Sequence, residues 1–364
     1  MAEMRICFYT SDIREFGGIG RATRIIAERL VKLGEWVGIV SLTCSEAGAE
    51  MPKILTSLHV QFDERVRLRR VFFKCVQNLR AYLKANRIDV LVCTMEMLSP
   101  VCAAAVRGLQ TKYVCWLHSD ADVYNEYGFQ RQCRFIAVKS AAAIIAVNDR
   151  MAEQLERKYR IHDITCILNP VDERLLSKQI DYKLDSMRII SVGRLSYQKN
   201  FELLADVAKL VFERHPEWRW DIYGEGGNRE SIERRIEENG LAGRLNLMGA
   251  VSNIYERYPE YAMQVMTSRY EGFPMALLEG MACGLPLISF DMASVRRIIR
   301  DGKNGFLIMP HDVEGMAERI CALIERPELR AEMSVQNELY RHEFDVGRIT
   351  ENWLKLLVRV KHDA

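Results

Sequence analysis

The chain has 364 residues and a formal net charge of +2, and 49% of its residues are hydrophobic against 27% charged. This composition is that of an ordinary folded protein, so a disordered chain and a collagen-like chain are both excluded. With 51 basic and 49 acidic residues the charge is nearly balanced, which argues against a dedicated nucleic-acid-binding protein, and the length fits about two domains.

The first half of the chain alternates short apolar runs with segments of helical period. The runs are apolar throughout, which is typical of parallel strands buried on both faces. Strands are therefore predicted at residues 4–10, 37–43, 88–94, 112–117, 143–147 and 164–168. Helices are predicted between them at 19–33, 71–86, 97–107, 131–140 and 149–159, which gives an open, doubly wound α/β sheet.

A polar stretch at residues 169–186 interrupts this alternation, and we interpret it as a linker. The alternation then restarts, with strands predicted at 188–192, 219–224, 244–248, 263–267, 285–290 and 305–308. Helices are predicted at 200–214, 228–239, 274–283, 294–300 and 312–325, and an amphipathic stretch follows at 347–360. The sequence thus predicts two successive α/β domains, with the cleft between them as the default ligand site.

Ten cysteines are spread along the chain without a C-x-x-C pair or a Cys/His cluster of zinc spacing. Several lie in predicted strands, so we expect reduced thiols that pack as small apolar side chains in a cytoplasmic protein. The sequence has no secretory signal pattern, and no apolar run reaches the ~18–20 residues that span a bilayer.

Two loops carry residues suited to an anion. Glycines 17, 18 and 20 follow the first predicted strand and precede a helix, where they would let the backbone approach a ligand; a tight turn without a ligand is the alternative. Arg194 and Lys199 follow the first strand of the second domain, and together they would neutralise a diphosphate without a metal ion. Solvated surface cations are the alternative for this pair.

A third loop leads into an almost wholly apolar helix that we expect to begin at Pro274, a residue suited to the first helical position. Glu271 precedes this helix start and Glu279 lies within the helix. Carboxylates only accept hydrogen bonds, so the two would suit sugar hydroxyls. A solvated helix face is the alternative for Glu279, but a lone carboxylate on a buried helix requires a partner.

The E-x7-E spacing of Glu271 and Glu279, in the setting YEGFPMALLEGMACGLP, resembles the retaining glycosyltransferases of family 4, also called group 1. The resemblance covers nearly the whole chain, and it also rests on five further blocks: WLH at 116–118, NPVD at 169–172, VGRL at 192–195 with Lys199, YGEG at 223–226, and DGKNGFL at 301–307. It implies the GT-B fold: an acceptor-binding Rossmann-like domain (1–170), a donor-binding domain (171–345) facing it across a cleft, and a helix (346–364) that crosses back to the first domain.

The same resemblance implies roles for individual residues. Arg194 and Lys199 would hold the nucleotide diphosphate, Glu279 the ribose hydroxyls, Glu271 the donor sugar, and His118 would approach the transferred sugar. The other donor-binding positions that it implies are Gly18, Gly20, Gly193, Gly272, Phe273, Met275, Ala276 and Leu277. Gln198-Lys199-Asn200 departs from the Lys-Gly of many relatives, which leaves the local turn geometry open.

Asp120 and Asp122 form an Asp-x-Asp pair, which holds a divalent metal in the other large glycosyltransferase architecture. We expect instead capping aspartates and a metal-independent enzyme with no cofactor, because Arg194 and Lys199 already supply positive charge. The alternative for His118 is a purely structural role in its loop.

Residues 65–87 hold eight basic residues, and no acidic residue falls between Glu64 and Asp89. A basic amphipathic helix here is typical of membrane-surface binding, and a core-packed helix with a charged outer face is the alternative.

Taken together, the sequence predicts a retaining glycosyltransferase that moves a hexosyl or N-acetylhexosaminyl unit from a nucleotide sugar, expected to be UDP-linked, to a glycan or lipid-linked acceptor. Lipopolysaccharide-type cell-surface polysaccharides are the expected setting, in the cytoplasm or at the inner face of the membrane. The alternatives are a nucleotide-sugar 2-epimerase, an inverting transferase, or a non-catalytic two-domain sugar-binding protein.

Overall fold

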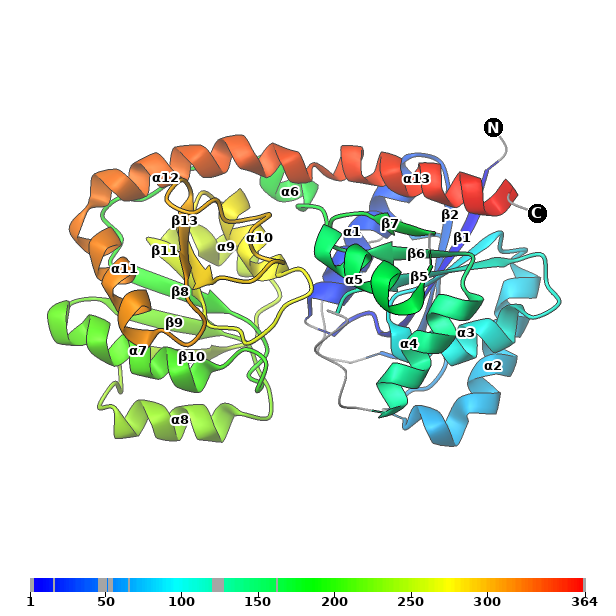
Figure 1. Ribbon diagram of the computed structural model, residues 1–364, viewed down its shortest axis with the longest axis horizontal. Helices are drawn as coiled ribbons and strands as arrows, with labels where there is room; N and C mark the ends of the chain where they lie inside the picture. Colours follow the sequence, from blue (N-terminus) through cyan, green and yellow to red (C-terminus); the bar gives the residue numbers. More distant parts are fainter. Residues whose placement is uncertain are drawn as a thin grey trace. The chain divides into compact units, whose positions relative to one another are not determined.

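The computed structural model describes residues 3–15, 17–44, 51, 55–64, 66–119, 128–161 and 163–362. The chain forms two compact units: unit 1 comprises Met1–Pro170 and Val346–Ala364, and unit 2 comprises Val171–Asp345. The units meet in the sequence at 170/171 and 345/346. Each unit has its own parallel sheet with helices on both faces (Figure 1).

Unit 1 is built on a seven-stranded sheet with the order β3-β2-β1-β4-β5-β6-β7. Its strands are β1 (Arg5–Asp12), β2 (Trp36–Thr43), β3 (Ser57–Val60), β4 (Val90–Cys93), β5 (Lys112–Leu117), β6 (Ala143–Ala146) and β7 (Ile164–Cys166). Its helices are α1 (Gly18–Lys32), α2 (Leu68–Ala85), η1 (Glu96–Leu98), α3 (Ser99–Val106), α4 (Gly128–Ser140), α5 (Asp149–Tyr159) and α13 (Val346–His362). All pairs are parallel; Ile6, for example, lies between Val37 of β2 and Val90 of β4.

The last helix of the chain completes the core of unit 1. Trp353 of α13 is fully buried, and its ring packs edge-on against Trp116 of β5 with centroids 4.7 Å apart. The ring centroid of Phe8, in β1, lies 6.1 Å from that of Trp353. Helices α1 and α13 contact each other, whereas α2, α3 and α4 form a second packed layer (Figure 1). The predicted return of the last helix to the first domain is thus seen in the packing of α13 in unit 1.

Unit 2 has a six-stranded parallel sheet with the order β10-β9-β8-β11-β12-β13. Its strands are β8 (Arg188–Val192), β9 (Arg219–Tyr223), β10 (Leu245–Gly249), β11 (Met263–Met266), β12 (Leu287–Phe290) and β13 (Gly305–Ile308). Its helices are α6 (Glu173–Leu176), α7 (Phe201–Arg214), α8 (Arg229–Glu238), α9 (Ile254–Arg257), η2 (Tyr258–Glu260), α10 (Met275–Ala282), α11 (Val313–Glu325), α12 (Pro327–Tyr340) and η3 (Arg341–Phe344). Both sheets have the Rossmann strand order, as predicted.

One predicted helix is wrong and several elements were missed. Residues 293–298 form successive turns instead of a helix over 294–300, and the side chain of Asn304 accepts the Arg300 N–H at 2.7 Å, where a helix would use a backbone carbonyl. The missed elements include edge strand β3, which has four residues and is only half-buried, and α12, whose buried face includes Arg330 and Asn337. The expected linker also contains the short helix α6.

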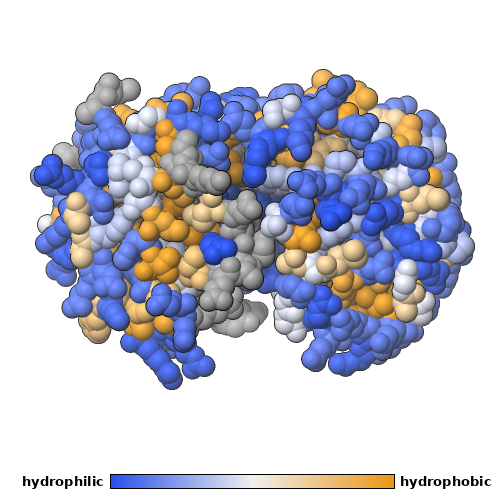
Figure 2. Space-filling model, turned by 180° about the vertical axis from the view of Figure 1, so that it is seen from behind, coloured by the Kyte–Doolittle hydropathy of each residue, from blue (hydrophilic) through white to orange (hydrophobic). Residues whose placement is uncertain are grey.

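The surface is mostly hydrophilic, with small hydrophobic patches on the face seen in Figure 2. Over the described residues, no helix combines the length and the apolar character needed to cross a bilayer. All ten cysteines belong to the described part of the chain, and none of them forms a disulfide bond there.

Candidate functional site

The strand order of unit 2 reverses between β8 and β11. The chain moves from β8 to β9 and β10 on one side, and later places β11, β12 and β13 on the other. Open α/β sheets bind ligands at such a switch point, beyond the carboxyl ends of the strands. The two loops that leave it, 193–200 after β8 and 267–274 after β11, contain Arg194, Lys199 and Glu271.

Side-chain and backbone hydrogen bonds join these two loops. Thr267 donates its hydroxyl to the backbone oxygens of Lys199 and Asn200 at 3.1 and 3.2 Å. Arg269 donates to the side chain of Asn200 at 2.6 Å, and Gln198 donates to the carbonyl of Tyr270 at 3.0 Å. Because Asn200 adopts a left-handed backbone conformation with φ of 56°, α7 begins at a sharp corner. The loops therefore form one connected surface at the switch point.

Two glycines let the loop after β8 pack tightly. A Cβ on Gly193 would lie 2.9 Å from Cε of Lys199, so the lysine side chain crosses the glycine directly. A Cβ on Gly224, in the loop after β9, would lie 1.8 Å from the carbonyl oxygen of Gly193. Gly224 also has a φ of +151°, which L side chains rarely adopt. These contacts explain why glycine is the second residue of both sequence blocks, VGRL and YGEG.

Lys199 and Glu271 form a largely buried ion pair, with Nζ and Oε1 2.5 Å apart and side chains 15% and 7% exposed. Arg194 is exposed on the same loop. The structure thus brings together three of the residues predicted to act on the donor. A buried lysine keeps three N–H donors, so the same ammonium group has the capacity to bind a carboxylate and a phosphate oxygen.

Helix α10 carries the second glutamate. It begins at Met275, with Pro274 as its N-cap in an extended conformation, so the prediction that Pro274 is the first helical residue is one position too early. Proline has no N–H and a ψ of 91° here, which places it before the helix rather than in it. The backbone N–H groups of Met275, Ala276 and Leu277 form the first turn, where the helix dipole favours an anion.

Glu279 is 1% exposed, so the solvated-face alternative is excluded. Its carboxylate lies 3.3 Å from the hydroxyl of Tyr258 and 3.5 Å from that of Tyr255. Neither tyrosine was predicted, and the signal that could have found them is the requirement for donors around a buried carboxylate. Gly280 packs against Gln264 of β11, which holds the helix close to the sheet. Phe273 is also buried, with its ring 6.0 Å from that of Phe344, and Gly272 precedes it.

The predicted residues of unit 1 lie at the carboxyl ends of its strands. Helix α1 begins at Gly18, with Gly17 as its N-cap, shortly after β1 ends. Strand β1 is central in the sheet and lies beside β4, where the strand order reverses. A Cβ on Gly20 would lie 3.3 Å from the carbonyl oxygen of Glu15, so this turn is tight. The neighbouring Phe16 lies outside the described residues.

His118 follows β5 and packs on Trp116, with ring centroids 4.3 Å apart. Burial lowers the pKa of His118 to about 3, so the imidazole is neutral at physiological pH. Its Nε2 is buried without a hydrogen-bond partner in the described part of the chain. The following residue, Ser119, donates to Glu96 at 2.7 Å, and Glu96 pairs with Arg134 at 3.0 Å in a buried ion pair that the sequence did not predict.

The Asp120/Asp122 metal alternative falls outside the described residues. Among those that are described, no group of three or more His, Cys, Asp or Glu side chains is arranged to hold a metal ion.

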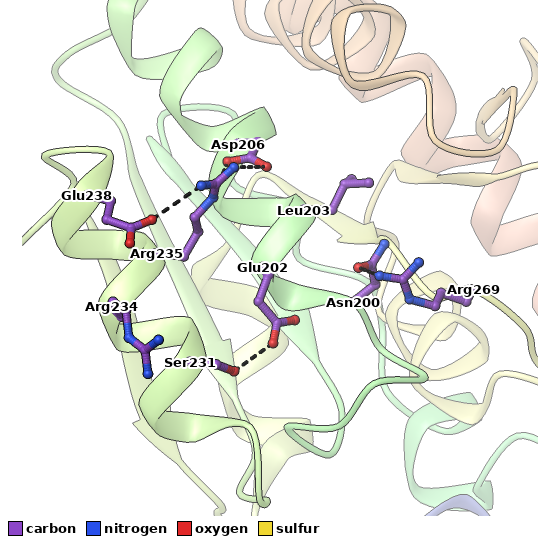
Figure 3. Close-up of a pocket in the computed structure, with 9 residues that line it drawn as sticks. All are labelled: Asn200, Glu202, Leu203, Asp206, Ser231, Arg234, Arg235, Glu238 and Arg269. Atoms are coloured by element: carbon purple, nitrogen blue, oxygen red, sulfur yellow. Dashed lines mark hydrogen bonds and ion pairs between the residues drawn. The ribbon is translucent and has the colours of Figure 1, made fainter.

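A separate hollow of about 380 Å³ lies between α7 and α8 (Figure 3). Its polar side chains largely bond one another: Ser231 donates to Glu202 at 2.7 Å, and Arg235 pairs with Asp206 at 2.7 Å. Asn200 and Arg269 line one end, so the hollow adjoins the loops of the switch point without containing the predicted site residues.

Two Rossmann-like α/β units in one chain are the architecture of the GT-B class of enzymes. Residues 172–339 match the model for glycosyl transferases group 1, and residues 16–175 match the model for Glycosyltransferase Family 4. Together the two models cover residues 16–339. The chain therefore belongs to the family 4 (group 1) glycosyltransferases, and it is a glycosyltransferase, as predicted.

Relatives and solved structures agree with this placement. The chain is 25% identical over 364 residues to an uncharacterized glycosyltransferase of Haemophilus influenzae, covering 97% of this chain and 99% of that protein. It is also 25% identical over 371 residues, 99% of each chain, to the GalNAc-α-(1→4)-GalNAc-α-(1→3)-diNAcBac-PP-undecaprenol α-1,4-N-acetyl-D-galactosaminyltransferase of Campylobacter jejuni. The fold is similar to pneumococcal GtfA in complex with UDP and GlcNAc, with a TM-score of 0.81 at 16% identity and full coverage of both chains. It is likewise similar to sucrose-phosphate synthase from Thermosynechococcus elongatus, with a TM-score of 0.84 at 17% identity, covering 98% and 99%.

Proposed function

We propose that this GT-B enzyme transfers a hexosyl or N-acetylhexosaminyl unit from a UDP-sugar to a glycan or lipid-linked glycan acceptor in bacterial glycan synthesis, with retention at the anomeric carbon. The observation that carries the proposal is the assembly of Arg194, Lys199, Glu271 and Glu279 around one switch point. Two relatives support the classes of transferred sugar and product, because they are an α-1,4-N-acetylgalactosaminyltransferase acting on an undecaprenol-linked glycan and a poly(ribitol-phosphate) α-N-acetylglucosaminyltransferase.

In this proposal, Arg194 and Lys199, with the amides at the start of α10, stabilise the charge that develops on the departing diphosphate. Glu279 accepts the ribose hydroxyls and Glu271 the hydroxyls of the donor sugar. Lys199 is already paired with Glu271. A phosphate that binds Lys199 therefore either shares its ammonium group with the Glu271 carboxylate or displaces that carboxylate. The leaving phosphate oxygen accepts the proton of the acceptor on the front face of the sugar.

From unit 1, we assign His118 to the transferred sugar and the loop of Gly18 and Gly20 to the donor phosphates. A neutral imidazole serves there as a hydrogen-bonding group rather than as a cation. We further propose that the reaction needs no metal ion, because the two cations supply the charge. Activity in the presence of EDTA is the expected result, and loss that Mn²⁺ restores would favour the Asp120/Asp122 alternative.

Variants of the two cations test the proposal. Arg194→Ala and Lys199→Ala are each expected to lower kcat by about 10²–10³ in an assay with UDP-GlcNAc or UDP-GalNAc, if they stabilise the leaving group. Lys209→Ala, an exposed lysine on α7, is the matched control and is expected to keep full activity. Near-normal turnover in both variants would contradict the assignment. NMR of the product then separates the alternatives: an inverted anomer indicates an inverting transferase, and a free 2-epimeric sugar indicates an epimerase.

We also propose that unit 1 contacts an anionic membrane through α2 and α4. Helices α2, α3 and α4 contain no acidic residue, whereas α7 and α8 of unit 2 mix both signs. Arg69, Arg70 and Lys74 are exposed on α2 beside Phe73, whose side chain is 81% exposed. Arg69 stacks on Phe129 at the start of α4, with 4.4 Å from Cζ to the ring centroid. Exposed cations around an apolar side chain match the headgroups and acyl boundary of an anionic bilayer.

Co-sedimentation with vesicles tests this contact. The protein is expected to bind phosphatidylglycerol-containing vesicles and not neutral phosphatidylcholine vesicles. The Arg70→Glu/Lys74→Glu variant is expected to bind at least about tenfold more weakly, since each basic residue contributes about 1 kcal/mol at such a surface. Lys209→Glu/Arg234→Glu on unit 2 makes the same change in net charge as a control. Equal recovery with neutral and anionic vesicles would count against the contact.

A further inference from the structure

Two tyrosine hydroxyls from the short segment between β10 and β11 contact the carboxylate of Glu279. Tyr258 Oη lies 3.3 Å from Oε2 and Tyr255 Oη lies 3.5 Å from Oε1, so each carboxylate oxygen has its own tyrosine. The tyrosines lie three residues apart, where α9 passes into η2. A helical spacing of three places two side chains on one face, which explains how a single turn of chain supplies both groups.

Tyr258 is held rigidly. Its side chain is fully buried in a cluster with Ile190, Ile254 and Leu285. Its hydroxyl also lies 3.2 Å from the carbonyl oxygen of Ala276, one turn before Glu279 in α10. The Tyr258 hydroxyl has only one proton to donate, and a carboxylate is a stronger acceptor than a neutral carbonyl. The proton is therefore donated to Glu279. Tyr255 is half-buried, and the guanidinium of Arg174 lies 5.5 Å over its ring.

From this geometry we infer that Tyr255 and Tyr258 are positioning residues, which fix the plane of the Glu279 carboxylate so that it recognises vicinal hydroxyls of the bound nucleotide. The inference rests on the proposed function, in which Glu279 binds the ribose. A carboxylate on α10 could rotate about its last torsion, which is a broad and soft one. Two phenols on opposite oxygens restrict this rotation. A carboxylate offers about four acceptor sites, so binding of these donors is compatible with further donors from a ligand.

The test compares two ligands that differ only in those hydroxyls. Affinities for UDP and for 2′,3′-dideoxy-UDP are measured by calorimetry on the wild type, Tyr258→Phe and Tyr255→Phe. Removal of one hydrogen bond is expected to weaken UDP about 5–10-fold in Tyr258→Phe, and less in Tyr255→Phe, where the contact is longer. Dideoxy-UDP is expected to change by less than about twofold, since it lacks the groups that Glu279 would contact. In turnover assays KM for the donor rises while kcat is nearly kept.

Tyr261→Phe is the matched control. Tyr261 is a fully buried tyrosine three residues after Tyr258, but it donates to Asp221 at 2.8 Å. Its loss is expected to affect the two ligands equally. The inference also predicts that Tyr258→Phe has no further effect on UDP binding in a Glu279→Gln background.

Equal weakening of both ligands in Tyr258→Phe would show a general structural role and overturn the inference, as would unchanged UDP affinity in both variants. A wild type that binds neither ligand would contradict the proposed UDP donor, and the inference would fail with it. The first two results leave the donor assignment intact, so the two failures are distinguishable.

Discussion

His118 shows how a single buried side chain makes stability depend on pH. Burial lowers its pKa from 6.5 to about 3 in the folded protein, whereas the unfolded chain titrates near the ordinary value. Between these pH values the unfolded state binds more protons. The contribution of His118 is therefore fully present above pH 6.5 and is lost as pH falls towards 3.

We predict that the free energy of unfolding falls by about 1–2 kcal/mol more between pH 6.5 and pH 5 in the wild type than in His118→Asn, which cannot be protonated. Urea unfolding at the two pH values measures the difference. His342→Asn, at an exposed position, serves as the control for loss of any histidine. Parallel pH profiles in the wild type and His118→Asn would contradict the prediction.

At the level of elements, α10 depends on close packing against β11. A Cβ on Gly280 would lie 1.6 Å from Oε1 of Gln264. Gln264 is 1% exposed and donates to the carbonyl of Ala276 at 3.0 Å, so its amide has little freedom to move. Glycine at this position brings the helix, and with it Glu279, towards the sheet.

Gly280→Ala is expected to destabilise the protein by about 1–3 kcal/mol through overpacking, although alanine in an ordinary helix interior would stabilise it by up to about 1 kcal/mol. The sign of the change is therefore diagnostic. Gln264→Ala in the same chain removes the obstructing amide and is expected to restore part of the loss. Chemical denaturation of the single and double variants measures both effects, and a Gly280→Ala protein as stable as the wild type would exclude the contact as a constraint.

Elements with a strong apolar pattern were predictable from the sequence, and the others were not. The buried central strands and the long helices other than α12 were found within a few residues of their ends, because continuous apolar runs and helical periods follow from burial. Helix α12 was missed because its buried face includes polar residues such as Arg330 and Asn337. Strand β3 was missed because an edge strand buries little, and the false helix at 294–300 has the apolar content of a helix but bonds through Asn304. In the site, the motif indicated Glu271 and Glu279, while Tyr255, Tyr258, Glu96 and Arg134 matter only through contacts between segments distant in sequence.

At the scale of the whole molecule, unit 1 is discontinuous in sequence because α13 belongs to its core. Trp353→Ala removes a fully buried ring between Trp116 and Phe8 and is expected to cost about 3–5 kcal/mol. Hydrogen exchange is expected to increase in β1, β5 and α1, with little change in α7 and α11 of unit 2. Lys355→Ala, on the exposed side of the same helix, should leave protection unchanged. Unaltered protection of β1 in Trp353→Ala would contradict a core role for this helix.

The position of Trp353 has a consequence for synthesis on the ribosome. Unit 2 is a single continuous segment, Val171–Asp345, so all of its strands are available before α13 emerges. The sheet of unit 1 is translated first, yet Trp116 and Phe8 wait for Trp353, which is made more than 230 residues after Trp116. The earlier-synthesised unit is therefore the later one to complete its core, and its unfilled apolar face is the part of the nascent chain that a chaperone would have to protect.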